Sequence, residues 1–291
     1  MMEQHLACFW EHVGNIIDQA LVEDHVSADV TTQALIPDHF KGAVVIRAKA
    51  EGVLAGVEIA KAVFMHVDPT LTVGVHITDG NRVKKGDIVA TISGELVSIL
   101  QAERPALNFL CRLSGIATQT AKYVQAVQGL KTKITDTRKT TPGLRPFEKY
   151  AVRVGGGQSH REHLGDWILI KDNHLMALSC LGFGIKDAVK RAREGSPSGD
   201  ITRIEIEVES VEQAREALEA GADIIMLDNM SLEDMKRAVE ICEGKAIIEA
   251  SGGITIKNVR AVAETGVDLI SVGALTHSAK SLDMSLKLAI C

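Results

Sequence analysis

The spacing of apolar and polar residues divides the chain into two parts. From residue 42 to residue 100, short runs rich in β-branched residues ("GAVVIRAKA", "GVLAGVE", "TVGVHITDG" and "DIVATISGELVSIL") are separated by Gly, Asp and Asn. This pattern predicts an antiparallel sheet with accompanying helices. The first 24 residues fit an amphipathic helix, and residues 102–128 have apolar positions at helical spacing, which predicts a helix that connects two domains.

From Lys131 onward, short apolar runs alternate with loops or helical patterns, as parallel βαβ units require. Each run ends in charged residues, serine or glycine. The positions are Arg138 and Lys139, Lys171, Glu207, Asp228, Ser251 with Gly252 and Gly253, and Gly273. Because the βα loops of a barrel build its active face at the carboxyl ends of the strands, we predict an α/β barrel of six or seven strands.

An open doubly wound sheet would show the same alternation of strands and helices. Its dinucleotide-binding form would have G-x-G-x-x-G directly after the first strand. The glycines at 155–157 instead follow the helical pattern "PFEKYAVRV", so we interpret them as a turn.

Composition excludes several function classes. The chain has 291 residues, with Lys+Arg 32 against Asp+Glu 38 and a net charge of -6, which argues against nucleic acid or an anionic membrane as the main partner. Five scattered cysteines without a C-x-x-C pair suggest reduced thiols. Neither a signal peptide nor a run of roughly 18 to 20 apolar residues is recognisable. We therefore expect a cytoplasmic protein.

Positive charge is nevertheless concentrated in one stretch, Lys131 to Lys171, with nine Lys or Arg against four Asp or Glu. A single Arg or Lys is usually a solvated surface residue. Several on separate loops of one barrel face instead predict a site for a small polyanion. The candidate cations are Arg104, Arg138, Lys139, His160, Arg161 and Lys171. Lone histidines such as His160, His174 and His277 are more often structural.

Carboxylates form a second candidate group. In "RIEIEVES", alternation places Glu205, Glu207 and Glu209 on one strand face, which would point into the barrel if the apolar face packs on helices. We expect Glu205 and Glu209 to pair with lysines or face solvent. Glu207 and Asp228 are the candidates for contact with a metal, a cation or sugar hydroxyls.

Two glycine-containing strand ends, "ASGGIT" and "SVGALTHS", are the last in the chain. Glycine lets the backbone approach a ligand closely, and barrels often bind phosphate in their final two loops. Together they predict a phosphate site.

Long motifs in a fixed order resemble those of the quinolinate phosphoribosyltransferase family, whose members are also called carboxylating nicotinate-nucleotide pyrophosphorylases. They are "ERPALNFLCRLSGIAT", "DTRKTTPGLRPFEKYAVRVGGGQSHR", "ILIKDNH", "IEIEVES", "IMLDNMS", "EASGGI" and "SVGALTHS", with "DVTTQALIP" and "GVLAGVE" upstream. The resemblance covers most of the chain. It departs from the family pattern at Ala28, Gln158 and Ser159, none of which is a candidate charged residue.

The resemblance implies a type II phosphoribosyltransferase fold. This comprises an N-terminal α/β sandwich over residues 1–115, joined by a tail at about 278–291, and an incomplete TIM-like α/β barrel over residues 116–277. It also implies a homodimer with shared active sites, a unit that in this family sometimes assembles further into a hexamer, and a requirement for Mg²⁺. The implied reaction joins quinolinate to 5-phosphoribosyl-1-pyrophosphate and yields nicotinate mononucleotide, pyrophosphate and CO₂ in NAD biosynthesis.

The resemblance also implies a role for each candidate residue. Quinolinate would contact Arg138, His160 and Arg161, together with Arg104 of the partner subunit. The implied catalytic residues are Lys139, Lys171, Glu207 and Asp228, the last two holding the ribose and its metal. The implied 5-phosphate site consists of Ser251, Gly252, Gly253, Gly273 and His277.

Two alternatives stay open. A related transferase could act on another acid such as nicotinate, although a monoacid needs fewer cations. A non-catalytic relative could bind phosphorylated sugars, although Lys171, Glu207 and Asp228 are all present.

Overall fold

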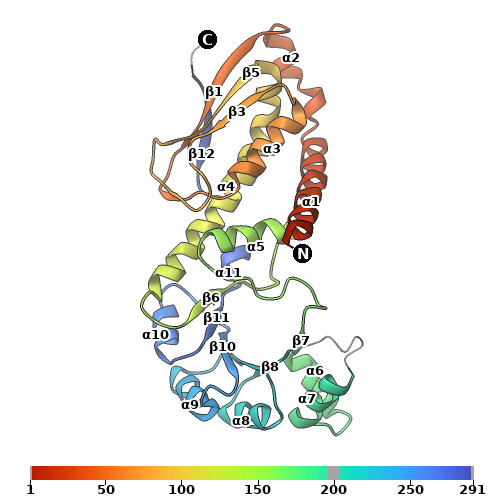
Figure 1. Ribbon diagram of the computed structural model, residues 1–291, viewed down its shortest axis with the longest axis vertical. Helices are drawn as coiled ribbons and strands as arrows, with labels where there is room; N and C mark the ends of the chain where they lie inside the picture. The colour runs from red at the N-terminus through yellow and green to blue at the C-terminus, as the bar shows by residue number, and fades with distance from the viewer. Residues whose placement is uncertain (1, 196–202, 290–291) are drawn as a thin grey trace. The chain divides into compact units, whose positions relative to one another are not determined.

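The computed structural model describes residues 2–195 and 203–289, and it divides into two compact units (Figure 1). The first unit comprises Met1–Ala121, Thr141–Gly156 and Ala279–Cys291, and the second comprises Lys122–Thr140 and Gly157–Ser278. Among the described residues, no helix combines the length and the apolar character that crossing a membrane requires.

The first unit is built on a four-stranded antiparallel sheet in the order β12-β1-β5-β3. Its strands are β1 (Lys41–Ala48), β3 (Thr72–Val75), β5 (Ile88–Glu95) and β12 (Met284–Leu288). Alternate residues of β1, namely Val44, Ile46 and Ala48, are buried, as expected for a sheet with one face on the core. A small sheet pairs β2 (Gly52–Val53) with β4 (Arg82–Val83).

The helices of the first unit, including the one predicted in the first 24 residues, follow the sequence pattern with two corrections. They are α1 (Met2–Glu23), η1 (Val26–Ala28), α2 (Val30–Leu35), α3 (Val57–Val67), α4 (Leu96–Ala126) and α5 (Arg145–Val154). The expected strand "GVLAGVE" is extended only at β2, because α3 begins at Val57. The expected strand "DIVATISGELVSIL" ends at Glu95, and α4 begins at residue 96, not at residue 102.

The start of α4 is set by burial at helical spacing. Leu96, Ile99 and Ala102 are all buried, at intervals of three that place them on one helix face. Further along α4, Gly115 lies against the backbone of Lys280 and Ser281. A Cβ atom at Gly115 would lie 2.9 Å from the carbonyl carbon of Lys280 and closer still to its oxygen. Only glycine allows this close approach.

The second unit contains a six-stranded parallel sheet in the order β6-β11-β10-β9-β8-β7 (Figure 1). The strands are β6 (Lys133–Thr135), β7 (Ile168–Ile170), β8 (Ile204–Val208), β9 (Ile224–Asp228), β10 (Ile247–Ser251) and β11 (Leu269–Ser271). The intervening helices are α6 (Asp172–Ser179), α7 (Ile185–Glu194), α8 (Val211–Glu219), α9 (Leu232–Cys242), α10 (Val259–Glu264) and α11 (Ala274–His277).

This strand order distinguishes the two predicted architectures. From β7 to β11, strands that follow one another in the chain are neighbours in the sheet. The first strand of this sheet in chain order, β6, pairs with the last, β11, so that β6 and β7 form the two edges of the sheet. A doubly wound sheet would reverse direction at a switch point. The order is therefore that of an incomplete barrel, and the predicted fold class and strand number of six or seven are confirmed.

Candidate active site

A cavity of about 540 Å³ lies at the carboxyl ends of the strands of the second unit. Its walls come from the carboxyl-terminal parts of strands β7 to β11 and from loops between strands, including the one after β6, far apart in the chain. The predicted site residues that line it are Arg138, Lys139, His160, Arg161, Lys171, Glu207, Asp228, Ser251, Gly252 and Gly253.

Three predicted residues do not line this cavity. Arg104 is an exposed residue of α4 in the first unit. Gly273 directly precedes α11. A Cβ atom at Gly273 would lie 3.1 Å from Cδ of Lys139, so Gly273 contacts the side chain of that lining residue. His277 ends α11, and its Nδ1 lies 2.6 Å from the hydroxyl of Ser278. The functional roles of these three residues, and of the residues that line the cavity, stay predictions.

The cationic wall is built around the loop after β6. The backbone N–H of Lys139 donates to Oγ1 of Thr137 at 3.0 Å, and the hydroxyl of Thr276 donates to the carbonyl of Lys139 at 2.8 Å, which fixes the loop. Nε of Arg138 is buried and has no hydrogen-bond partner within the described residues. Burial and the nearby charge of Arg138 lower the pKa of Arg161. A bound anion would stabilise both guanidinium groups.

His160 lies in a buried cluster with two carboxylates. Its backbone N–H donates to Asp136 at 2.9 Å, and its Nε2 lies 3.3 Å from Glu205 and 3.4 Å from Oε2 of Glu249. Both glutamates have 0% side-chain exposure. Trp167 lies beside the imidazole, with the ring centroids 4.9 Å apart.

The ionisation of His160 follows from these contacts. Burial by itself lowers the pKa of an imidazole, but hydrogen bonds to Glu205 and Glu249 outweigh it and raise the pKa of His160 to about 9. Burial raises the pKa of Glu249, and Glu205 adds to that effect while His160 opposes it. The imidazole is therefore positively charged at neutral pH.

The expectation that Glu205 pairs with a lysine or faces solvent is wrong. Its strand face is the predicted one, but that face is covered by His160 and Trp167, so Glu205 is fully buried. Glu209, on the same face, is exposed as predicted. Sequence reasoning also missed Glu249, which lines the cavity. Its signal was available, because it is a lone charged residue inside the apolar run "AIIEAS".

The acidic wall consists of Glu207 and Asp228. One carboxylate oxygen of Glu207 is buried without a hydrogen-bond partner within the described part of the chain, and Nζ of Lys171 lies 3.6 Å from it, too far for a direct hydrogen bond. Burial raises the pKa of Glu207; Lys171 opposes this shift, while Asp228 and Asp172 reinforce it. Asp228 accepts a hydrogen bond from the side chain of Asn229 at 2.8 Å.

The glycine turn after β10 completes the cavity. Gly252 and Gly253 have φ of 84° and 60°, in the left-handed region. The backbone N–H of Asn229 donates to the carbonyl of Ser251 at 3.0 Å. A Cβ atom at Gly252 would lie 2.8 Å from that same nitrogen and closer to the Asn229 side chain. The turn therefore requires glycine at position 252.

Within the part of the chain that the structure describes, two groups of side chains could hold a metal ion. Glu207 and Asp228 supply hard oxygen ligands at the cavity wall, the type that Mg²⁺ prefers. His160, Glu205 and Glu249 each offer a ligand atom, and these atoms lie within 4.8 Å of one another.

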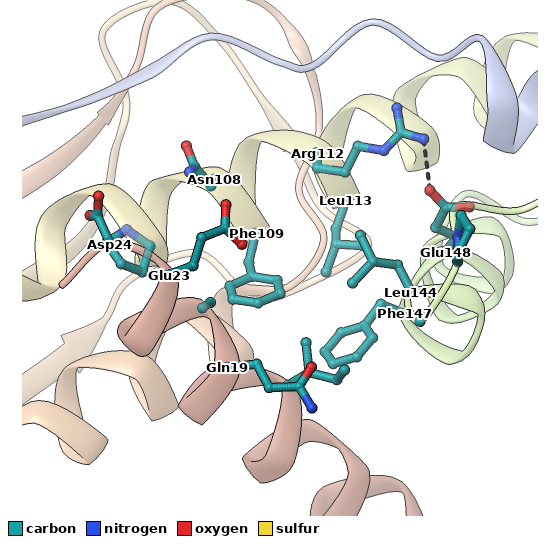
Figure 2. Close-up of a pocket in the computed structure, with 15 residues that line it drawn as sticks. Gln19, Glu23, Asp24, Asn108, Phe109, Arg112, Leu113, Leu144, Phe147 and Glu148 are labelled. Carbon is teal, nitrogen blue, oxygen red and sulfur yellow. Dashed lines mark hydrogen bonds and ion pairs between the residues drawn. The ribbon is translucent and has the colours of Figure 1, made fainter. Parts of the chain in front are cut away.

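A second cavity, of about 490 Å³, lies within the first unit (Figure 2). Figure 2 shows Phe109 of α4 and Phe147 of α5 at its wall, with Arg112 donating to Glu148 at 2.7 Å. Glu148 is fully buried and also accepts from the backbone and hydroxyl of Thr141. The residues that line this cavity include no predicted site residue, and Arg112 and Glu148, two of its charged residues, are paired with each other.

Comparisons with known proteins match nearly the whole chain. The model of the "Quinolinate phosphoribosyl transferase, N-terminal domain" matches residues 29–114, and that of the C-terminal domain matches residues 116–287. The resemblance found in the sequence motifs is thereby confirmed.

Individual relatives agree with the family models. The probable nicotinate-nucleotide pyrophosphorylase [carboxylating] of Bacillus subtilis is 42% identical over 94% of this chain and 93% of its own length. The nicotinate-nucleotide pyrophosphorylase [carboxylating] of Mycobacterium leprae is 41% identical over 97% of this chain and 99% of its own. The crystal structure of NadC from Streptococcus pyogenes is 44% identical, with a TM-score of 0.89, over 96% of this chain and 97% of that chain.

Proposed function

The chain belongs to the quinolinate phosphoribosyltransferase family, and we propose that it transfers the phosphoribosyl group of 5-phosphoribosyl-1-pyrophosphate to quinolinate with loss of CO₂. The products would be nicotinate mononucleotide, pyrophosphate and CO₂, so the enzyme is a pentosyltransferase of NAD biosynthesis. The observation that carries this proposal is the cavity of the second unit, which has cations on one wall, carboxylates on another and a glycine turn beside them.

The cationic wall suits a dicarboxylate. Quinolinate carries two negative charges, and Arg138, His160 and Arg161 offer three cationic side chains around one cavity. Charge-assisted hydrogen bonds contribute about 1.5–3 kcal/mol each, so two or three of them would also offset repulsion from the phosphates of the second substrate. The buried Nε of Arg138, without a partner among described residues, supports this role.

The acidic wall suits the ribose and its metal ion. The buried oxygen of Glu207 accepts no hydrogen bond within the described residues and has only Lys171 near it at 3.6 Å, so it fits a hard cation, with Asp228 as the second ligand. Mg²⁺, when bound, would neutralise charge on the departing pyrophosphate. Glu207 and Asp228 would also stabilise the positive charge that develops on the ribose at its anomeric carbon.

The remaining residues orient the two substrates. The ring nitrogen of quinolinate attacks the anomeric carbon, a C–N bond forms, and the C–O bond to pyrophosphate breaks. The positively charged ring nitrogen then accepts the electrons released when the adjacent carboxylate leaves as CO₂, and the ring carbon takes up a proton. Lys139 and Lys171 would hold the pyrophosphate-bearing ribose beside quinolinate.

The 5-phosphate would bind between two loops. One is the glycine turn at Ser251, Gly252 and Gly253, and the other runs from Gly273 to His277. The contact of Gly273 with the side chain of Lys139 supports a common location at this end of the unit.

We further propose a homodimer, able to assemble further into a hexamer, in which Arg104 of the partner subunit completes the quinolinate site. Mixing Arg104→Ala and Arg138→Ala subunits tests this, because one site of each mixed dimer would be intact. Random pairing predicts roughly a quarter of wild-type activity from two inactive variants. No recovery after confirmed subunit exchange would refute a shared site.

We expect the enzyme to work in the cytoplasm, where its scattered cysteines would stay reduced.

The function is tested by supplying purified protein with 5-phosphoribosyl-1-pyrophosphate and Mg²⁺, together with quinolinate or, in parallel, nicotinate. Formation of nicotinate mononucleotide and CO₂ from quinolinate alone is expected. Arg138→Ala should abolish productive quinolinate binding, whereas Arg237→Ala, at an exposed arginine of α9, is the matched control. Product from nicotinate, or from neither acid, would contradict the proposal.

A further inference from the structure

We propose that Glu205 and Glu249 are positioning residues, which together with Trp167 hold His160 in one orientation as a fixed cation at the wall of the quinolinate site. This inference rests on the proposed function, and it assigns a task to three residues through their contacts with His160.

The first argument is geometric. Strands β8 and β10 each supply one carboxylate, and both carboxylates point to the same atom, Nε2 of His160, at 3.3 and 3.4 Å. The backbone of His160 is fixed independently by Asp136. A ring held at its backbone and at one nitrogen cannot rotate freely, so the edge of His160 that lines the cavity has a defined place.

Trp167 stabilises this arrangement through contacts with both Glu205 and His160. Its indole N–H donates to Oε2 of Glu205 at 2.6 Å, and its ring packs against His160 at an interplanar angle of 58°. Its backbone carbonyl accepts a hydrogen bond from Nη1 of Arg161 at 3.3 Å. The same residue therefore supports two of the cations assigned to quinolinate.

The second argument is electrostatic. Two fully buried carboxylates beside an anion-binding cavity would be costly in themselves and would repel the substrate. A charged imidazole between them offsets this charge, because its Nε2 lies 3.3 Å from Glu205 and 3.4 Å from Glu249. His160 and Glu249 both line the cavity. The net charge of this cluster therefore affects the electrostatic potential where quinolinate would bind.

The test uses substitutions that keep side-chain shape and remove charge. Glu249→Gln and Glu205→Gln should raise the KM and Kd for quinolinate by about tenfold or more, the effect of weakening one charge-assisted contact. The affinity for 5-phosphoribosyl-1-pyrophosphate should stay within about twofold, because its assigned residues are untouched. Glu209→Gln is the matched control on the same face of the β8 segment, and it should behave like wild type because Glu209 is exposed.

A double-mutant cycle separates positioning from a general structural effect. If Glu249 acts through His160, then Glu249→Gln should cause no further loss of quinolinate affinity in a His160→Gln background. Trp167→Phe keeps an aromatic ring beside His160 but removes the indole N–H that Glu205 accepts and reduces the ring packing, so it should raise the quinolinate KM even if Glu205→Gln fails to fold.

Three outcomes would overturn the inference while leaving the proposed function intact. Unchanged quinolinate binding in Glu249→Gln, with binding by the wild type, would refute the positioning role alone. Fully additive losses in the cycle would also refute it, as would a divalent ion that copurifies with the wild type and is lost from Glu249→Gln. Absence of quinolinate binding by the folded wild type would instead overturn the proposed function, and this inference with it.

Discussion

Replacing Gly252 by alanine should disrupt the turn after β10 for two separable reasons. First, φ at this position is 84°, and a left-handed conformation costs a residue with a Cβ atom about 1–2 kcal/mol. Second, that Cβ atom would lie 2.8 Å from the backbone nitrogen of Asn229. Asn229 itself has φ of 52° and donates to the carbonyl of Ser251, so it cannot move without loss. Overpacking of this kind costs about 1–3 kcal/mol, for a total of roughly 2–5 kcal/mol.

The neighbouring Gly253 provides the matched control. Its φ is 60°, but a Cβ atom there would lie 3.9 Å from the nearest atom found, Oδ1 of Asn229, which is ordinary contact. Gly253→Ala should therefore show only the conformational cost of about 1–2 kcal/mol. The free energies of unfolding of the two variants should differ by about 1–3 kcal/mol. Each kcal/mol should change Tm by about 2–4 °C.

Two assays separate stability from function. Thermal unfolding measures the destabilisation, and titration with 5-phosphoribosyl-1-pyrophosphate or ribose 5-phosphate reports on the turn as a phosphate site. Gly252→Ala should weaken binding of both ligands by about tenfold or more, because about 1.4 kcal/mol of distortion corresponds to that factor. Equal Tm values and equal affinities for the two variants would show that the close contact with Asn229 has no energetic effect.

Three other variants or conditions test separate parts of the structure. Gly115→Ala should destabilise the protein by about 1–3 kcal/mol because its methyl group would meet the backbone of Lys280, whereas Gly14→Ala in α1 should be neutral or stabilising by up to about 1 kcal/mol; equal Tm values would contradict this. Glu207→Ala should lower kcat by about 10²–10³ with a smaller effect on quinolinate affinity, and the reverse pattern in parallel rate and binding measurements would exclude the assigned role. Since His160 is charged below its pKa, quinolinate affinity should hold as pH rises past 6.5 and decline as pH passes about 9, and a profile that falls near 6.5 would contradict a charged His160.

The sequence was informative where local pattern decides the structure. Short apolar runs followed by charged residues or glycine predicted the strand ends, and the cavity contains Lys171, Asp228 and Gly252 from three of those ends. This works for strands such as β7 and β9, which are apolar up to the sheet edge, so that the first charged residue marks the strand end. It fails for Glu205 and Glu249, which lie inside β8 and β10.

Two features escaped prediction because their causes lie outside the local pattern. The run "ELVSIL" is too short to distinguish a strand from a helical turn by period, and the helical choice appears only in the burial of Leu96 and Ile99. Alternation gave the face of Glu205 but not what covers it, since Trp167 and His160 come from 38 and 45 residues earlier in the chain. Burial by such distant residues cannot be read from "IEIEV" itself.

The order of strands has a consequence for how the chain folds during synthesis. In the first unit, β1 at residues 41–48 finds its outer partner only in β12 at residues 284–288. In the second unit, β6 at residues 133–135 reaches the other strands only through β11 at residues 269–271. Neither sheet can be completed before residues 269–288 have been synthesised. A ribosome-bound chain that lacks these residues exposes unpaired strand edges in both units at once. Pairings this distant in sequence are slow to form and prone to aggregation, so premature termination near residue 265 should be far more harmful than its small loss of mass suggests.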